Sequence, residues 1–215
     1  MMPSKKILLF ALSGVLLLAS ASSARADALF VGTSADLGLC CFNVDLHQVS
    51  PDVMAVKVTL TDGAQYFVDT GSGQHPGFAF SLAGDPTITI SSIDSPWTLA
   101  DVSYSPVTTG GPSGGTFDYS IANPGSGASA HNSGPLTFDI TDTSGISFSS
   151  FVTSSGSGGG NYFVADIMNA AGATGLSFIA GAPVVTPEPS SLLLLGTGIV
   201  GMAGLLRRRM GASKN

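Results

Sequence analysis

One stretch of the sequence has residue types and a spacing that could support acid–base chemistry. The apolar run Tyr66-Phe67-Val68 leads into Asp69-Thr70-Gly71-Ser72, so a strand would deliver a carboxylate to a tight turn. Two carboxylates that share a proton can activate water, which makes hydrolysis the reaction class to consider. The sequence has no second Asp-Thr-Gly run, because Asp142-Thr143-Ser144-Gly145 has an extra residue before its glycine.

The Asp69 run resembles the active-site loop of aspartic peptidases, which carries Asp-Thr-Gly-Ser after an apolar residue. Such peptidases use two copies of this run, and a homodimer could supply the second copy here. The middle of the chain is rich in these four residue types, so the run also arises by chance. We predict a strand that leads into a turn at Asp69, and a hydrolase with paired aspartates remains one hypothesis.

The histidines and aspartates do not follow a known metal-binding spacing. His47, His75 and His131 are far apart in the sequence, and solvated loop positions are the simplest expectation for them. Calcium would suit the many aspartates and the carbonyl groups of glycine- and serine-rich loops, but no EF-hand spacing is present. We therefore predict no dedicated metal site and no cofactor. The aspartates that a calcium ion would use are Asp62, Asp69, Asp139 and Asp142.

Two adjacent cysteines, Cys40 and Cys41, leave several interpretations open. Neighbouring Cα atoms lie about 3.8 Å apart, below the usual range for a disulfide, so a bond between them would be strained. In a strand the two thiols would point to opposite faces. One thiol could then join the core, while the other could react or bond to a second chain.

Aromatic residues with a polar group could contact a sugar. Trp97 follows Pro96 where a loop enters a strand, so its ring could be an exposed ligand contact. Packing in the core is the commoner position of a single tryptophan and is the alternative. The other residues of this kind are Tyr104, Tyr119 and Tyr162.

Short segments in which apolar and polar residues alternate predict strands along the middle of the chain. Glycine-rich turn clusters separate them, and no helical pattern of ten residues occurs before Leu192. The sequence therefore predicts an all-β fold, an antiparallel β-sandwich or a jelly roll, over residues 27–185. Residues 165–171 would also fit a helical turn. The expected strands are 42–47, 56–60, 78–82, 87–90, 117–121, 136–140, 146–149, 162–168 and 176–179.

The charges of this middle part exclude some partners. Lys57 is its only basic residue, against thirteen aspartates and no glutamate, which gives a formal charge of −12. Such a body repels nucleic acid and anionic lipid, so we expect no nucleic-acid partner. Aspartate favours turns whereas glutamate favours helices, in agreement with an all-β fold.

The first 26 residues have the three parts of a secretory signal peptide. Lys5 and Lys6 precede an apolar stretch from Ile7 to Leu18, and Ala24-Arg25-Ala26 is a cleavage site of the A-x-A type. Twelve apolar residues make about 18 Å of helix, too short to cross about 30 Å of hydrocarbon. We predict that signal peptidase cuts after Ala26.

The end of the chain has the order of a membrane-anchored sorting segment. An apolar helix is expected over residues 190–206, about 25 Å long, followed by the basic tail 207–215. Arg207, Arg208 and Arg209 would stop the helix on the cytoplasmic side of the inner membrane and leave the preceding chain outside. Pro187-Glu188-Pro189 would stay extended just before the helix.

These three parts resemble a PEP-CTERM sorting signal over residues 186–215. The resemblance implies an exported protein of a Gram-negative bacterium that makes extracellular polysaccharide. It also implies that an exosortase, a membrane-embedded cysteine peptidase, recognises the signal and cuts near Pro187. A plain tail anchor behind a proline-rich linker is the alternative.

We predict an exported protein that is first anchored in the inner membrane and then reaches the cell surface or the extracellular matrix. A non-enzymatic structural or adhesive role is expected, with exopolysaccharide as a partner besides exosortase and signal peptidase. A carbohydrate-binding module is the alternative, followed by a hydrolase with paired aspartates.

Overall fold

The structure is a computed structural model that describes residues 27–32, 34–35, 42–70, 75–110, 114–156, 159–186, 198 and 201–202. Several predictions from the sequence lie outside these residues. They are the signal peptide 1–26, Cys40 and Cys41, the motif Pro187, Glu188 and Pro189, almost all of the segment 190–206, and Arg207, Arg208 and Arg209.

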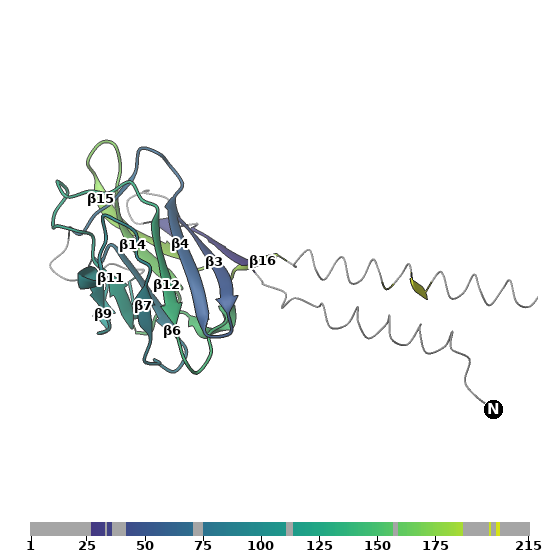
Figure 1. Cartoon of the computed structure of the whole chain (residues 1–215). Helices are drawn as coiled ribbons and strands as arrows, with labels where there is room; N and C mark the ends of the chain where they lie inside the picture. Colours follow the sequence, from purple (N-terminus) through teal and green to yellow (C-terminus); the bar gives the residue numbers. More distant parts are fainter. Residues whose placement is uncertain are drawn as a thin grey trace, which may run out of the picture. The chain divides into compact units, whose positions relative to one another are not determined.

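Residues Asp27–Thr186 form one compact unit of antiparallel strands (Figure 1). Two 3-10 turns, η2 (Leu99–Asp101) and η3 (Phe148–Ser150), are the only helical elements among its described residues. The strands are β1 (Asp27–Val31), β2 (Ser34–Ala35), β3 (Phe42–Ser50), β4 (Val53–Leu60), β5 (Tyr66–Phe67), β6 (Phe78–Leu82), β7 (Thr89–Ser91), β8 (Val102–Ser103), β9 (Val107–Thr108), β10 (Thr116–Phe117), β11 (Tyr119–Ile121), β12 (Leu136–Thr141), β13 (Phe151–Val152), β14 (Phe163–Met168), β15 (Thr174–Ile179) and β16 (Val184–Thr186).

Most strands belong to two sheets, which we call sheet A and sheet B. Sheet A has the order β16-β1-β3-β4-β12-β7. Sheet B has the order β2-β15-β14-β6-β11-β8, with β13 beside β6 and β5 beside β14. All pairs in both sheets are antiparallel, which confirms the predicted all-β antiparallel fold.

Sheet A shows the alternation that the sequence predicts. In β12, Leu136, Phe138 and Ile140 are buried, while the residues between them are half-buried on the outer face. Strands β6 and β14 of sheet B do not alternate, because every one of their residues is buried. The strand pair β9–β10 packs through Val107 and Phe117 against the face of sheet B that points away from sheet A, so sheet B is covered on both sides.

Phenylalanine rings join the two sheets across a shared core. Phe30 of sheet A meets Phe163 of sheet B edge to face, with ring centroids 4.9 Å apart. Phe138 of sheet A lies 6.1 Å from both Phe78 and Phe80 of sheet B. Such aromatic pairs add to the free energy gained by burying the rings.

One local prediction is wrong and one alternative is excluded. The predicted strand 146–149 is a loop that continues into η3, because Ile146 donates its backbone N–H to Pro51 and Ser147 bonds to the Ser150 hydroxyl instead of a neighbouring strand. The predicted strand 162–168 is confirmed, and the helical turn that was its alternative over residues 165–171 is absent. Strand β14 runs to Met168 and a turn closed by Asn169 follows it.

Phe163→Ala is expected to lower the free energy of unfolding of residues 27–186 by about 3–5 kcal/mol, because a fully buried ring leaves a cavity. Leu99→Ala is the matched control, since Leu99 is 59% exposed and its loss should change stability by less than about 0.5 kcal/mol. Urea unfolding measures both. Equal effects of the two variants would contradict the assignment of this core.

Candidate functional site

The candidate polar site lies on the outer face of sheet B, where β14 carries an aspartate. Phe163, Ala165 and Ile167 face the shared core, so Asp166 between them points to the other side. Asp166 is 0% exposed, although a carboxylate is rarely buried unless it is paired. Its burial marks it as the most unusual polar residue of the described body.

Asp166 contacts residues at both ends of the stretch from Val68 to Pro76. Its Oδ2 atom accepts hydrogen bonds from the backbone N–H of Thr70 at 2.8 Å and from the Thr70 hydroxyl at 2.7 Å. On the other side, Nδ1 of His75 lies 3.8 Å from the same oxygen. The backbone of Asp166 accepts from Val68 and donates to Pro76. The aspartate therefore holds residues 68–70 and 75–76 against β14.

Two atoms of this cluster have no hydrogen-bond partner in the described structure: Oδ1 of Asp166 and Nδ1 of His75. The neighbouring carboxylate of Asp69 lines a hollow of about 280 Å³ together with His75, Pro76 and Ser120. The cluster thus combines two carboxylates and one imidazole beside a small hollow.

Burial dominates the electrostatics of the cluster. It raises the pKa of Asp166, while the hydrogen bonds from Thr70 and the nearby His75 act in the opposite direction. Burial also raises the pKa of Asp69, and the Asp166 carboxylate raises it further, whereas His75 lowers it. Both carboxyl groups therefore keep a proton to a higher pH than an ordinary aspartate.

This cluster gives Asp69 the partner carboxylate that the sequence analysis did not find. The signal was present: Asp166 is the only charged residue in the otherwise apolar strand 163–168. The arrangement differs from a pair of carboxylates that both reach a substrate, because Asp166 is sealed from solvent and one of its oxygens is held by Thr70. The geometry fits a structural clamp better than a catalytic pair.

The structure does not bring the four calcium candidates together. Asp62 and Asp142 stabilise turns, since each accepts a hydrogen bond from a backbone N–H two residues later. Asp139 lies in β12 on the outer face of sheet A, and Asp69 belongs to the cluster on sheet B. Among the residues that the structure describes, no three histidines, cysteines or acidic residues are grouped to hold a metal ion.

The three histidines lie in separate places. His47 contacts Asp27 on the outer face of sheet A, and His131 packs its ring against Tyr66 at 4.6 Å. Of the three, His75 is the one that lies beside the buried Asp166 and beside Asp69.

The predicted ligand contact at Trp97 does not fit its position. Trp97 is 3% exposed and its ring meets Phe67 edge to face at 5.7 Å, so it packs in the core. Tyr119 is buried as well, and its hydroxyl donates to Pro86. Tyr104 is exposed, and its hydroxyl accepts the backbone N–H of Ile90. Neither Trp97 nor Tyr119 presents a ring face to a ligand.

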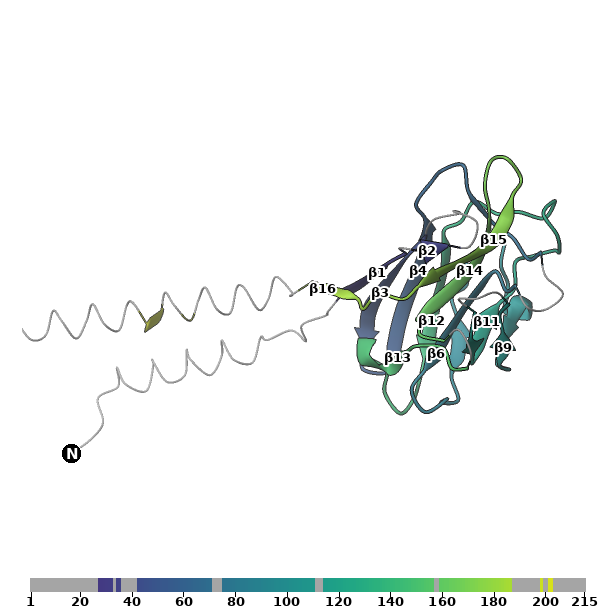
Figure 2. The same cartoon turned by 180° about the vertical axis from the view of Figure 1, so that it is seen from behind.

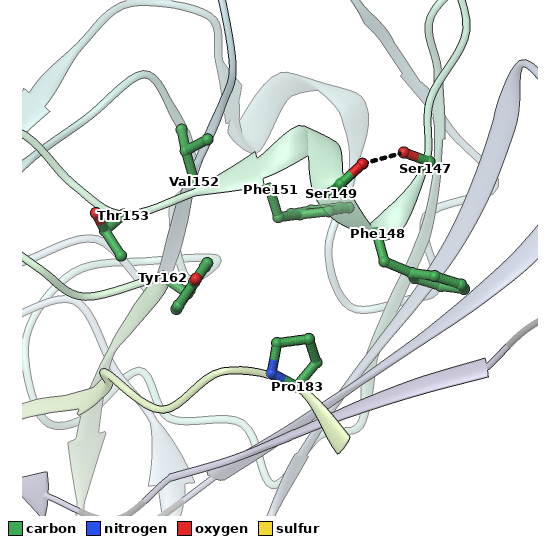
Figure 3. Close-up of a pocket in the computed structure, with 8 residues that line it drawn as sticks. All are labelled: Ser147, Phe148, Ser149, Phe151, Val152, Thr153, Tyr162 and Pro183. Carbon is green, nitrogen blue, oxygen red and sulfur yellow. Dashed lines mark hydrogen bonds between the residues drawn. The ribbon is translucent and has the colours of Figure 1, made fainter. Parts of the chain in front are cut away.

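A groove beside η3 and β13 offers a different aromatic surface (Figure 3). It has a volume of about 680 Å³, and Phe148, Tyr162 and Pro183 surround its open space in the close-up. Hydroxyl groups of Ser147 and Ser149 line its rim, 2.9 Å from one another. Aromatic rings beside hydroxyl groups are the combination that sugars contact.

The first and last strands of the body lie side by side at one edge of sheet A (Figure 2). Asp27 pairs with Thr186, Ala28 with Val185 and Leu29 with Val184. The strand pair therefore begins at the first residue after the predicted signal-peptide cleavage site and ends at the residue before Pro187.

Comparison with known proteins identifies the end of the chain. Residues 185–209 match the PEP-CTERM protein-sorting motif, which confirms the resemblance seen in the sequence. The motif implies an exported protein that an exosortase sorts through its C-terminal segment, and the described residues 27–186 of this protein form an all-β body. No curated protein and no solved structure shows significant similarity to the chain. Among the described residues, no helix has both the length and the apolar character needed to cross a membrane.

The raised pKa values of Asp69 and Asp166 predict how stability changes with pH. The folded body binds more protons than the unfolded chain between the ordinary aspartate pKa and the raised values, so its free energy of unfolding falls as pH rises through that window. Asp166→Asn should flatten this dependence, because it removes one of the two acids with a raised pKa and the charge that acts on Asp69.

Urea unfolding at a series of pH values between 4 and 7 measures the effect. Asp139→Asn, on the outer face of the other sheet, controls for the loss of one negative charge. Identical slopes for the wild type, Asp166→Asn and Asp139→Asn would show that the cluster does not titrate as described.

Proposed function

We propose that the body is a non-enzymatic component of the cell surface or extracellular matrix, where it contacts exopolysaccharide. The observation that carries the proposal is the position of the sorting motif at the C-terminal end of the folded body. The matched residues begin at Val185, inside the last strand. A motif in this place delivers the whole body outside the cell. What acts there is then the surface of residues 27–186.

The chemistry of that surface supports contact with a neutral or weakly charged polymer. A body with one lysine and thirteen aspartates repels polyanions, while its many serine and threonine hydroxyl groups can exchange hydrogen bonds with sugars. The groove lined by Phe148, Tyr162 and Pro183 adds an apolar surface on which a sugar ring could stack. The groove favours a carbohydrate-binding module as the more specific form of the proposal.

A hydrolase with paired aspartates is the remaining candidate. Asp69 and Asp166 are neighbours with raised pKa values, as such a pair would require. However, Asp166 has no exposed surface and binds Thr70, so only Asp69 faces the hollow. We therefore favour the non-enzymatic role. A glycan-cleaving activity that disappears in Asp69→Asn, with the fold retained, would reverse this preference.

Tyr162→Ala is expected to weaken binding to exopolysaccharide from the same cells by roughly tenfold, because one aromatic contact is lost. Phe148→Ala, on the opposite side of the groove, should weaken binding in the same direction. Leu99→Ala removes an exposed apolar residue that does not line the groove, and it should bind like the wild type.

Affinity electrophoresis in gels that contain the polysaccharide measures these variants, with circular dichroism as the check of folding. Retention that is equal in the wild type, the groove variants and the control would rule out the groove as the binding site. A wild-type body that shows no retention would contradict polysaccharide contact altogether.

A further inference from the structure

The sorting motif and the folded body share residues. The motif begins at Val185, whereas β16 covers Val184–Thr186 and pairs with β1. Pro187 follows at once and has no N–H, so it cannot donate a hydrogen bond to β1. The peptide bonds expected to be cut near Pro187 therefore lie within a few residues of a strand that the body holds.

We propose that β16 binds either β1 or the cleft of the sorting peptidase, so that cleavage requires this strand to leave the body. The inference rests on the proposed sorting by an exosortase. A peptidase cleft binds its substrate as an extended chain through main-chain hydrogen bonds and side-chain pockets. One edge of β16 is already paired with β1, so the strand cannot enter an enclosing cleft while it remains in the sheet.

The structure makes the departure of β16 a local event. The strand is at the edge of sheet A, pairs with β1 at three positions and exposes 62% of Val184. The chain that leads to it from β15, residues 180–182, is exposed as well. Short edge strands with few buried contacts are the elements that open with the smallest free energy.

The rest of sheet A keeps β1 in place when β16 leaves. β1 pairs with β3 at five positions, from Asp27 opposite His47 to Val31 opposite Asn43. Its side chains Ala28 and Phe30 are 2% and 0% exposed in the shared core. Opening of β16 therefore leaves a folded body whose last residues are free for the enzyme. The rate of cleavage should follow the population of this open form.

A reversible lock on β16 tests the inference in the full-length chain, expressed in the cells that make it. Leu29→Cys with Val184→Cys places two cysteines directly opposite each other on β1 and β16. Opposite Cα atoms in an antiparallel pair lie about 4.5–5.5 Å apart, within the range of a disulfide. Both positions lie outside the matched motif, so the recognised signal is unchanged.

We expect the oxidised double variant to be cut at least tenfold more slowly than the wild type in a pulse-chase followed by intact mass. Reductant should restore the rate, because it frees β16 and leaves the matched motif unaltered. Each single cysteine variant controls for the substitutions and for unwanted bonds to Cys40 or Cys41.

Val184→Gly tests the opposite direction without a disulfide. It weakens an exposed strand position by roughly 1 kcal/mol, so cleavage should become about fivefold faster. A locked chain that is cut at the wild-type rate, with its disulfide verified by mass, would overturn the inference alone. A wild-type chain that is never cut would overturn the proposed sorting and this inference together.

Discussion

The body depends on the burial of phenylalanine rings between two antiparallel sheets. Residues 27–186 contain one lysine and no arginine, so ion pairs can contribute little to their stability. Most of the phenylalanines are instead fully buried, and those of sheet A meet those of sheet B directly. This core fixes which face of each strand turns inward. It thereby decides which polar residues reach the surface and which, like Asp166, are trapped on the covered face of sheet B.

The aspartates show how an acidic body without basic partners uses its charges. Asp62, Asp101 and Asp142 each accept hydrogen bonds from nearby backbone N–H groups and stabilise turns. Asp166 does the same over a long distance in the sequence, because Thr70 is ninety-six residues away from it. In this body, hydrogen bonds from backbone N–H groups to aspartate carboxylates therefore stabilise several loops.

The sequence predicts the central strands well because their alternation reflects burial of one face. The segment 78–82 was recognised as a strand although all five of its residues are buried, which an alternating pattern does not reveal. The cover over its second face comes from β9 and β10, whose pairing is too short to show in the pattern. The pattern predicts neither β1 nor β16: four consecutive apolar residues follow Asp27 in β1, so its sequence does not alternate, and the edge strand β16 has only three residues. The clamp around Asp166 depends on contacts between distant segments, so the local sequence pointed to Asp69 but not to its neighbour.

Export connects the ends of the chain to this fold. The pair β1–β16 lies between the predicted signal-peptide cleavage site and Pro187, so cuts after Ala26 and near Pro187 would leave every strand intact. The most direct test is the intact mass and terminal sequence of the mature protein recovered from the extracellular matrix. The account predicts a chain that begins at Asp27 and ends close to Pro187. A mature chain that retains Arg207, Arg208 and Arg209, or that has lost residues of β1 or β16, would contradict it.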